Sequence, residues 1–422
     1  MRQEKTIFSN IDWLVISIYF ALVLIGWLNI YAAVYDEEVQ KNIFDLSLNS
    51  GKQLIWIGTS VLIIIVIMTV DFRFYDSFAY IIYALVVFLL IIVLIVGTKV
   101  AGSTSWFSVG GFRVQPSEFA KFATALAVAK YMSKVNFKLS KFNDIFITAC
   151  LIAVPPILII FQGDTGTALV FGAFVIVLYR EGLNPTIIVI GLIAIALFVL
   201  TLIFDQITLI IAIAVVGGLI ITVGKKNWKR ILSIVVGMMI VISVVWSVDY
   251  FVNDILKPHQ QNRLKALINP EADPLGYGWN VTQSKIAIGS GGLLGKGYLK
   301  GTQTKFDFVP EQSTDFIFCT LGEEQGWFGT TLVIFLFVFL SIRIVQIAER
   351  QKETFARVYG YAVASILFIH FLINIGMTIG LFPVIGIPLP LLSYGGSSLW
   401  AFTILIFILL KIDAHRMQVL ER

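Results

Sequence analysis

The chain contains a long series of apolar runs, each about as long as a helix that crosses a lipid bilayer. A spanning helix needs roughly 20 mostly apolar residues, and the runs do not alternate as spanning β-strands would. Twelve runs fit: 13–34, 53–70, 77–97, 117–132, 144–161, 165–180, 185–204, 207–223, 230–250, 314–346, 357–381 and 396–412. The run 207–223 has a re-entrant hairpin as its alternative, because only two residues separate it from the run before.

These runs predict an all-α polytopic membrane protein with about 10–12 spanning helices. Of the 422 residues, 58% are hydrophobic and only 14% are charged, a composition that excludes a soluble globular domain. We expect one integral membrane domain over 1–422. Cys150 and Cys319 both lie inside apolar runs, which argues against a disulfide framework or a cysteine metal site.

Basic residues in the short loops predict the orientation. They follow even-numbered runs, which places them on the cytoplasmic side. They are Lys130, Lys134, Lys138, Lys141, Lys225, Lys226, Lys229, Arg230, Arg343, Arg350, Lys352, Arg357, Lys411, Arg416 and Arg422. Both termini are then cytoplasmic, and the large loop 251–313 before the last three helices is extracytoplasmic. The net charge of +5 is thereby explained without nucleic acid as a partner.

The loop 251–313 and the start of the next run concentrate the polar chemistry. A loop this long without a core of its own is usually functional, and we expect short helices in it, for example over 282–288. Asp315 follows in PEQSTDFIF, where Ser313 or Thr314 would cap a helix that carries Asp315 in its first turn. Asp315 is either a catalytic group or an acid stabilised by the helix dipole.

A glycine-rich motif, AIGSGGLLGKG, occupies 287–297 within this loop. Ser290, Gly291 and Lys296, with Lys285 nearby, are candidate contacts for a phosphate-bearing ligand, because glycine backbone and lysine suit an anion. The alternative is a turn that only packs closely against helices. The motif is not a Walker sequence, so a nucleotide site is not expected.

A second polar segment, STSWFSVGGFRVQPSEFAKF, covers 103–122. Trp106 and Arg113 lie in its outer loop, and Glu118 and Lys121 follow in the first turns of a helix. Their i, i+3 spacing permits a mutual ion pair, whereas Lys121 could instead face an anionic headgroup. A broken backbone is expected at PLPLLSYGG, before the last helix. The three histidines are scattered, which argues against a histidine metal site.

Six blocks of this sequence resemble one known family. QPSEFAK, DPLGYGWN, QSKIAIGSGGLLGKG, GTQTKFDFVPEQSTDFIF, GEEQGWFG and PLPLLSYGGSSLW are similar to the SEDS proteins, the RodA/FtsW/SpoVE family, and most similar to its RodA branch. The resemblance implies a peptidoglycan polymerase of the bacterial cytoplasmic membrane that uses lipid II and the nascent glycan. It further implies a class B penicillin-binding protein and the elongation machinery as partners.

The resemblance also implies roles for single residues. Asp315 matches the essential aspartate, Lys121 and Glu118 match the QPSE motif, and Trp106 and Arg113 match the preceding loop. The family typically has ten spanning helices, so two of the twelve runs, within 180–230, are a probable extra pair. FQGDTG around Asp164 departs from the family pattern.

Glycosyl transfer at the outer leaflet is therefore the expected activity. Asp315 is the candidate general base for an acceptor sugar hydroxyl. Lys121, Arg113, Lys285 and Lys296, alone or with a divalent cation such as Mg²⁺ or Mn²⁺, would stabilise the leaving lipid pyrophosphate. Two alternatives stay open: a transporter that flips lipid II, and a noncatalytic scaffold for a penicillin-binding protein.

Overall fold

The structure, a computed structural model, describes residues 10–36, 41–100, 102–109, 112–223, 227–255, 261, 277–306 and 308–416. Within these ranges, ten helices are long and apolar enough to cross a membrane. They are α1 (Trp13–Val34), α2 (Asn49–Thr69), α4 (Ala79–Val96), α6 (Phe142–Phe161), α9 (Pro185–Ile203), α10 (Gln206–Val223), α11 (Trp228–Tyr250), α14 (Ile317–Glu349), α15 (Thr354–Thr378) and α16 (Gly396–Ala414). The expected all-α polytopic membrane fold is confirmed.

Shorter elements lie between these helices. They are α3 (Phe72–Ser77), α5 (Pro116–Met132), α7 (Thr165–Val170), the 3-10 turn η2 (Phe171–Ala173), α8 (Phe174–Arg180), the π turn η3 (Phe251–Ile255) and α13 (Tyr277–Ser290). Two of the twelve predicted spans thus differ from expectation: 117–132 is the short α5, and 165–180 is divided among α7, η2 and α8. The run 207–223 forms a full helix, α10, and not a hairpin.

Contacts divide the chain into two compact units, 1–183 with 283–422, and Asn184–Thr282. The smaller unit holds α9, α10 and α11, whose residues are nearly all exposed. Apolar side chains around the whole circumference of a helix suit a lipid environment. Much of the predicted loop 251–313, namely 256–260 and 262–276, lies outside the described residues. The helix expected around 282–288 is part of α13.

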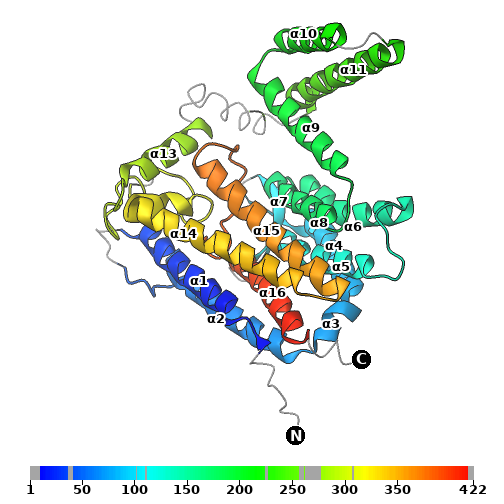
Figure 1. The fold of residues 1–422 in the computed structure, drawn as a ribbon. Helices are drawn as coiled ribbons and strands as arrows, with labels where there is room; N and C mark the ends of the chain where they lie inside the picture. Colours follow the sequence, from blue (N-terminus) through cyan, green and yellow to red (C-terminus); the bar gives the residue numbers. More distant parts are fainter. Residues whose placement is uncertain are drawn as a thin grey trace. The chain divides into compact units, whose positions relative to one another are not determined.

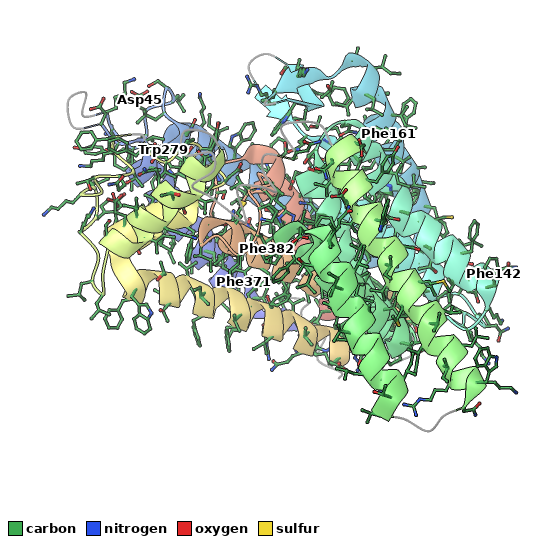
Figure 2. The ribbon with its side chains drawn as sticks, turned by 90° about the horizontal axis from the view of Figure 1, so that it is seen from above. Asp45, Phe142, Phe161, Trp279, Phe371 and Phe382 are labelled. Atoms are coloured by element: carbon green, nitrogen blue, oxygen red, sulfur yellow. The ribbon has the colours of Figure 1, made fainter. Side chains whose placement is uncertain are left out.

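The larger unit is built around α15 and α16, the two most buried of the ten helices long enough to span a membrane. α14 lies alongside α15 and α1, and α16 packs against α2 and α5 (Figure 1). The side of α5 that meets its neighbours is rich in alanine, including Ala120, Ala123 and Ala127, which lets helix backbones approach closely. Polar residues of α5 and α15 are therefore enclosed by protein. By contrast, Phe142 and Phe161, labelled at the two ends of α6 in Figure 2, expose their rings.

A small antiparallel sheet stands where we expected a loop. Its strands are β1 (Thr98–Val100), β2 (Ser103–Val109) and β3 (Phe112–Val114), in that order. Thr98 pairs with Trp106, and Ser108 pairs with Arg113. The segment STSWFSV is rich in residues that favour strands, but it is too short to stand out among the apolar runs.

Candidate active site

Asp315 lies in a run of turns that immediately precedes α14. The cap position of α14 is Phe316, with no side-chain cap, so the expected capping by Ser313 or Thr314 is wrong. Both hydroxyls have other partners: Ser313 Oγ accepts from Asn49 Nδ2 (3.1 Å), and Thr314 Oγ1 donates to the Glu311 carbonyl (3.2 Å). Asp315 is half-buried. Asp315 is therefore positioned by the loop and is not part of the helix.

The segment 381–395 forms one wall beside Asp315. Gly386 has φ of 70°, and a Cβ added to it would lie only 3.1 Å from Asp315 Oδ2. The Asn374 amide of α15 donates to the Asp315 carbonyl (2.9 Å) and to the Ile387 carbonyl (2.8 Å). One side chain therefore joins the Asp315 turn to this wall. Sequence reasoning missed Asn374 as a site residue.

Backbone contacts hold the same wall to the turn. Tyr394 N donates to the Ser313 carbonyl (2.9 Å), and Ser393 Oγ donates to the Thr314 carbonyl (2.5 Å). The described residues from 381 to 395 form no regular helix, and α16 starts at Gly396. The predicted break at PLPLLSYGG is confirmed. It provides the irregular backbone that a site inside a helix bundle needs.

Lys121 is fully buried next to the carboxylate of its own helix. Its Nζ lies 2.7 Å from Glu118 Oε2 and 2.8 Å from His370 Nε2. The predicted i, i+3 ion pair is confirmed. Phe402 of α16 lies under the ammonium, 4.7 Å from ring centroid to Nζ. Because protein covers all sides of it, Lys121 is placed to organise the site and not to meet a headgroup from bulk lipid.

Asp164 lies close to this pair and begins α7. Its carboxylate accepts from Thr167 N (3.0 Å) and from Gln115 Nε2 (2.8 Å), the residue just ahead of α5. Burial raises the pKa of Asp164 above its ordinary value, although the hydrogen bonds from Thr167 oppose that change. On the same side, a Cβ on Gly166 would lie 2.5 Å from the Ile385 carbonyl. The start of α7 therefore packs directly against the wall beside Asp315.

The glycine-rich turn after α13 is inserted into a break in α14. Gly326 interrupts that helix with φ 63° and ψ −158°. The freed backbone groups pair with the turn: Lys296 N with Glu323 O (3.0 Å), Gly297 N with Glu324 O (3.0 Å), Trp327 N with Gly292 O (2.9 Å) and Phe328 N with Leu293 O (3.3 Å). A Cβ on Gly291 would lie 2.0 Å from the Gly322 carbonyl. These glycines serve close packing, which was the alternative reading of the motif.

Glu323 holds the loop that follows this turn. Its buried carboxylate accepts from Lys296 Nζ (2.6 Å) and from three successive backbone N–H groups, those of Thr302 (2.7 Å), Gln303 (2.9 Å) and Thr304 (3.0 Å). Glu324 accepts from Leu299 N (3.1 Å). Lys296 is therefore engaged by protein, and any role for it in binding a substrate stays a prediction.

The other predicted contacts are more open. Lys285 and Ser290 are exposed on α13, and Ser290 Oγ donates to the Ala287 carbonyl (2.8 Å). Arg113 is exposed on β3, and its carbonyl accepts from Ser397 Oγ (3.5 Å), one residue into α16. Trp106 is half-buried in β2. Burial raises the pKa of the Tyr394 phenol, and the hydrogen bond with Trp56 and the charge of Arg113 oppose that change.

The structure thus brings together some of the predicted residues. Asp315, the Glu118–Lys121 pair and Arg113 all meet the segment 381–397 or α15. Gly291 and Lys296 belong instead to the turn packed against α14, and Ser290 is the last residue of α13. Among the described residues, no group of three His, Cys, Asp or Glu side chains could hold a metal ion. His370 and Asn374 were missed, although their i, i+4 spacing on one apolar helix was a usable signal.

A family model described as cell cycle protein, FtsW/RodA/SpoVE, matches residues 12–204 and 179–418 of the chain. The chain belongs to the FtsW/RodA/SpoVE family. It is 33% identical to peptidoglycan glycosyltransferase RodA of Treponema pallidum over 97% of this chain and 99% of that protein. It is 33% identical to peptidoglycan glycosyltransferase MrdB of Escherichia coli, over 85% of this chain and 84% of that protein.

Solved structures agree with membership in the FtsW/RodA/SpoVE family. A chain from a peptidoglycan synthase complex, described as coordinating polymerization and crosslinking, superposes with a TM-score of 0.72 at 25% identity, over 97% of this chain and 99% of that one. The Rod shape determining protein RodA of Thermus thermophilus superposes with a TM-score of 0.61 at 22% identity, over 96% of this chain and 97% of that one, and supports the fold.

Proposed function

We propose that this chain is a peptidoglycan glycosyltransferase that polymerises lipid II at the outer face of the bacterial cytoplasmic membrane. The observation that supports this proposal most directly is the environment of Asp315. A half-buried carboxylate lies in a turn whose carbonyl is bound by Asn374, beside Gly386, where an added Cβ would lie 3.1 Å from Asp315 Oδ2. The Treponema pallidum and Escherichia coli relatives, both named peptidoglycan glycosyltransferases, support this class of reaction.

Asp315 acts in this proposal as the general base. It removes the proton from the 4-hydroxyl of an acceptor sugar as that oxygen attacks the anomeric carbon of the donor. The bond to the lipid pyrophosphate breaks in the same step, so the configuration inverts. A positioned base commonly contributes about 10²–10⁴-fold to such a step. The fixed backbone around Asp315 suits this task, because the carboxylate need not be reorganised for each cycle.

The leaving pyrophosphate needs positive charge, and the predicted basic residues differ in whether their charged groups are exposed. Arg113 and Lys285 are exposed and able to meet a phosphate directly. Lys121 is enclosed with Glu118, so it contributes through position and not through contact. The described residues contain no group of three His, Cys, Asp or Glu side chains that could hold a metal ion. A divalent cation such as Mg²⁺ would therefore be bound by the pyrophosphate itself, and no proposed step depends on it.

The cellular setting is part of the same proposal. Both termini face the cytoplasm and the Asp315 turn faces outward, as the basic loop residues indicate. A class B penicillin-binding protein is the partner, supported by the similarity to a chain of a peptidoglycan synthase complex. The proposed role in elongation and rod shape follows from the resemblance to the RodA branch, a name that the Treponema pallidum relative carries. The helices α9 and α10 are the proposed extra pair.

The deciding experiment measures glycan chains made from purified lipid II. The protein is reconstituted with its partner transpeptidase, which carries a substitution that abolishes any glycan synthesis of its own. Wild type is compared with Asp315→Asn, which keeps the shape and removes the base. We expect chains with the wild type and a loss of at least about 100-fold with Asp315→Asn.

Glu311→Gln is the matched control, because Glu311 is an exposed carboxylate in the same run of turns. It should polymerise lipid II at the wild-type rate. Complex assembly is checked for each variant by size-exclusion chromatography. Full activity of Asp315→Asn in an intact complex would remove Asp315 from the mechanism and raise the transporter and scaffold alternatives.

A further inference from the structure

Lys121, Glu118 and His370 form a buried three-residue chain behind the Asp315 wall. Lys121 Nζ lies 2.7 Å from Glu118 Oε2 on one side and 2.8 Å from His370 Nε2 on the other. His370, on α15, is fully buried. The ring of Phe402 packs edge-on against the imidazole, 5.0 Å between centroids, and also lies under the ammonium. Lys121, Glu118 and His370 are therefore shielded from bulk water.

This geometry favours one form of the imidazole. A lysine ammonium has three hydrogens and no lone pair, so it can only donate. An ammonium paired with Glu118 therefore bonds to Nε2 only if that nitrogen accepts. Such a ring is neutral, with its hydrogen on Nδ1. Nδ1 is buried with no hydrogen bond of normal geometry among the described residues, and the backbone of Pro388 lies beside the ring.

His370 shares its helix face with the residue that holds Asp315. His370 and Asn374 are one turn apart on α15, and side chains at i and i+4 lie one above the other. Asn374 binds the carbonyls of Asp315 and Ile387, and Pro388 follows Ile387 directly. One face of α15 thus connects the Lys121 pair to the loop that walls Asp315. Figure 2 shows this part of α15 through the labelled Phe371, next to His370 in the chain.

We infer that His370 is a positioning residue for the reaction, acting as a neutral acceptor that holds the buried Lys121 ammonium between α5 and the wall at Asp315. The inference rests on the function proposed above. An apolar residue in its place would leave Lys121 with Glu118 alone and one buried N–H of the ammonium without an acceptor, which is costly unless the helices move. Such movement would shift Asn374, and with it Asp315, since both depend on the same helix.

The first test reads the tautomer directly. The full-length protein, in complex with its partner transpeptidase, is labelled with ¹⁵N-histidine, and the His370 signals are assigned by their loss in His370→Gln. We expect the hydrogen on Nδ1 and a proton-free Nε2 in the wild type. In Lys121→Met, Nε2 of His370 no longer has an ammonium from which to accept, and we expect the ¹⁵N signals of the ring to change. A wild-type ring with its hydrogen on Nε2 overturns the inference, whatever the activity.

The second test uses polymerisation of purified lipid II. His370→Gln keeps an acceptor at the position of Nε2, whereas His370→Leu removes it. We expect His370→Gln to stay within about threefold of wild type, and His370→Leu to lose about 10–100-fold in kcat with little change in KM, as expected for a misplaced catalytic group. His415→Leu is the control: it removes a buried histidine bound to the Lys411 carbonyl (2.9 Å) at the far end of α16.

The outcomes separate this inference from the proposed function. If the wild type makes glycan and His370→Leu is equally active, the inference fails and the function stands. Equal losses in His370→Gln and His370→Leu also overturn it, because a retained acceptor should rescue. If the wild type makes no glycan, the function fails, and the ring tautomer still decides whether His370 accepts from Lys121. The double variant His370→Leu/Lys121→Met should lose no more polymerisation activity than the less active of the two single variants. Both substitutions remove the same contact, so their effects should not add.

Discussion

The side-chain amide of Asn374 lies 2.9 Å from the backbone carbonyl of Asp315 and 2.8 Å from that of Ile387, so one residue of α15 holds both sides of the candidate site. Replacing Asn374 by leucine leaves two carbonyls without their donor. We expect the free energy of unfolding to fall by about 1–3 kcal/mol. We also expect glycan synthesis to fall further than the stability loss explains, because Asp315 is no longer held.

Chemical unfolding in detergent and lipid II polymerisation measure these two effects. Asn29→Leu is the matched control, because the buried Asn29 amide donates only within its own helix, to the Ile25 carbonyl (3.0 Å). Similar losses of activity in both variants would contradict a specific role for Asn374.

The break in α14 predicts different effects for two nearby glycines. An alanine Cβ at Gly295 would lie 2.1 Å from the Glu324 carbonyl, and Gly295 has φ of 78°. Gly295→Ala should therefore cost about 1–3 kcal/mol of stability from overpacking alone. A Cβ at Gly289 meets nothing within 4 Å, so Gly289→Ala should be neutral or stabilise α13 by about 0.5–1 kcal/mol. Thermal unfolding of both variants checks this, and equal effects would mean that the turn is not inserted as described.

Loss of the Glu323 charge should lower the free energy of unfolding by a large amount. Glu323→Gln removes a fully buried carboxylate that organises Lys296 and three backbone N–H groups, so we expect a loss of about 3 kcal/mol, as for other broken buried pairs. Glu349→Gln breaks the exposed pair with Arg180 and should cost no more than about 1 kcal/mol. Limited proteolysis is a second readout, because cleavage between 299 and 304 should accelerate only in Glu323→Gln. Slow cleavage there would show that other contacts hold the loop.

Asp164 predicts a pH effect on stability. Its pKa in the folded protein is raised from 3.8, mainly by burial. A carboxyl group with a raised folded pKa favours the folded state most below its unfolded pKa, and this contribution is lost as the pH rises through the folded pKa. Melting temperatures of the wild type should therefore fall from pH 4 upward more steeply than those of Asp164→Asn. Parallel curves for the two proteins would contradict the assignment.

Much of this architecture follows from local sequence. The run lengths predicted the spanning helices because a backbone in hydrocarbon must satisfy its own hydrogen bonds, which leaves helix as the available form. The spacing of Glu118 and Lys121 predicted their ion pair, since i and i+3 meet on any helix. The prolines and glycines of PLPLLSYGG predicted the break before α16.

Other features were missed because competing contacts or short elements leave little signal in the sequence. The hydroxyl residues before Asp315 suggested a cap at Ser313 or Thr314, but those hydroxyls bond to Asn49 and to the Glu311 carbonyl. The sheet at 98–114 was read as a loop, because three short strands carry little signal next to long apolar helices. Which lysine pairs with Glu323 could not be assigned from the sequence, because Lys296 lies 27 residues away along the chain.

By itself, the sequence determined that this chain spans a membrane, where its helices run and which side chains could carry chemistry. Only the tertiary structure decided which of those side chains meet. Asn374 and His370 read as isolated polar residues in an apolar helix until α5 and the segment 381–395 are packed against it. The reason is physical: a helix period places residues on a common face, whereas the partner of that face is chosen by packing between segments far apart in the chain.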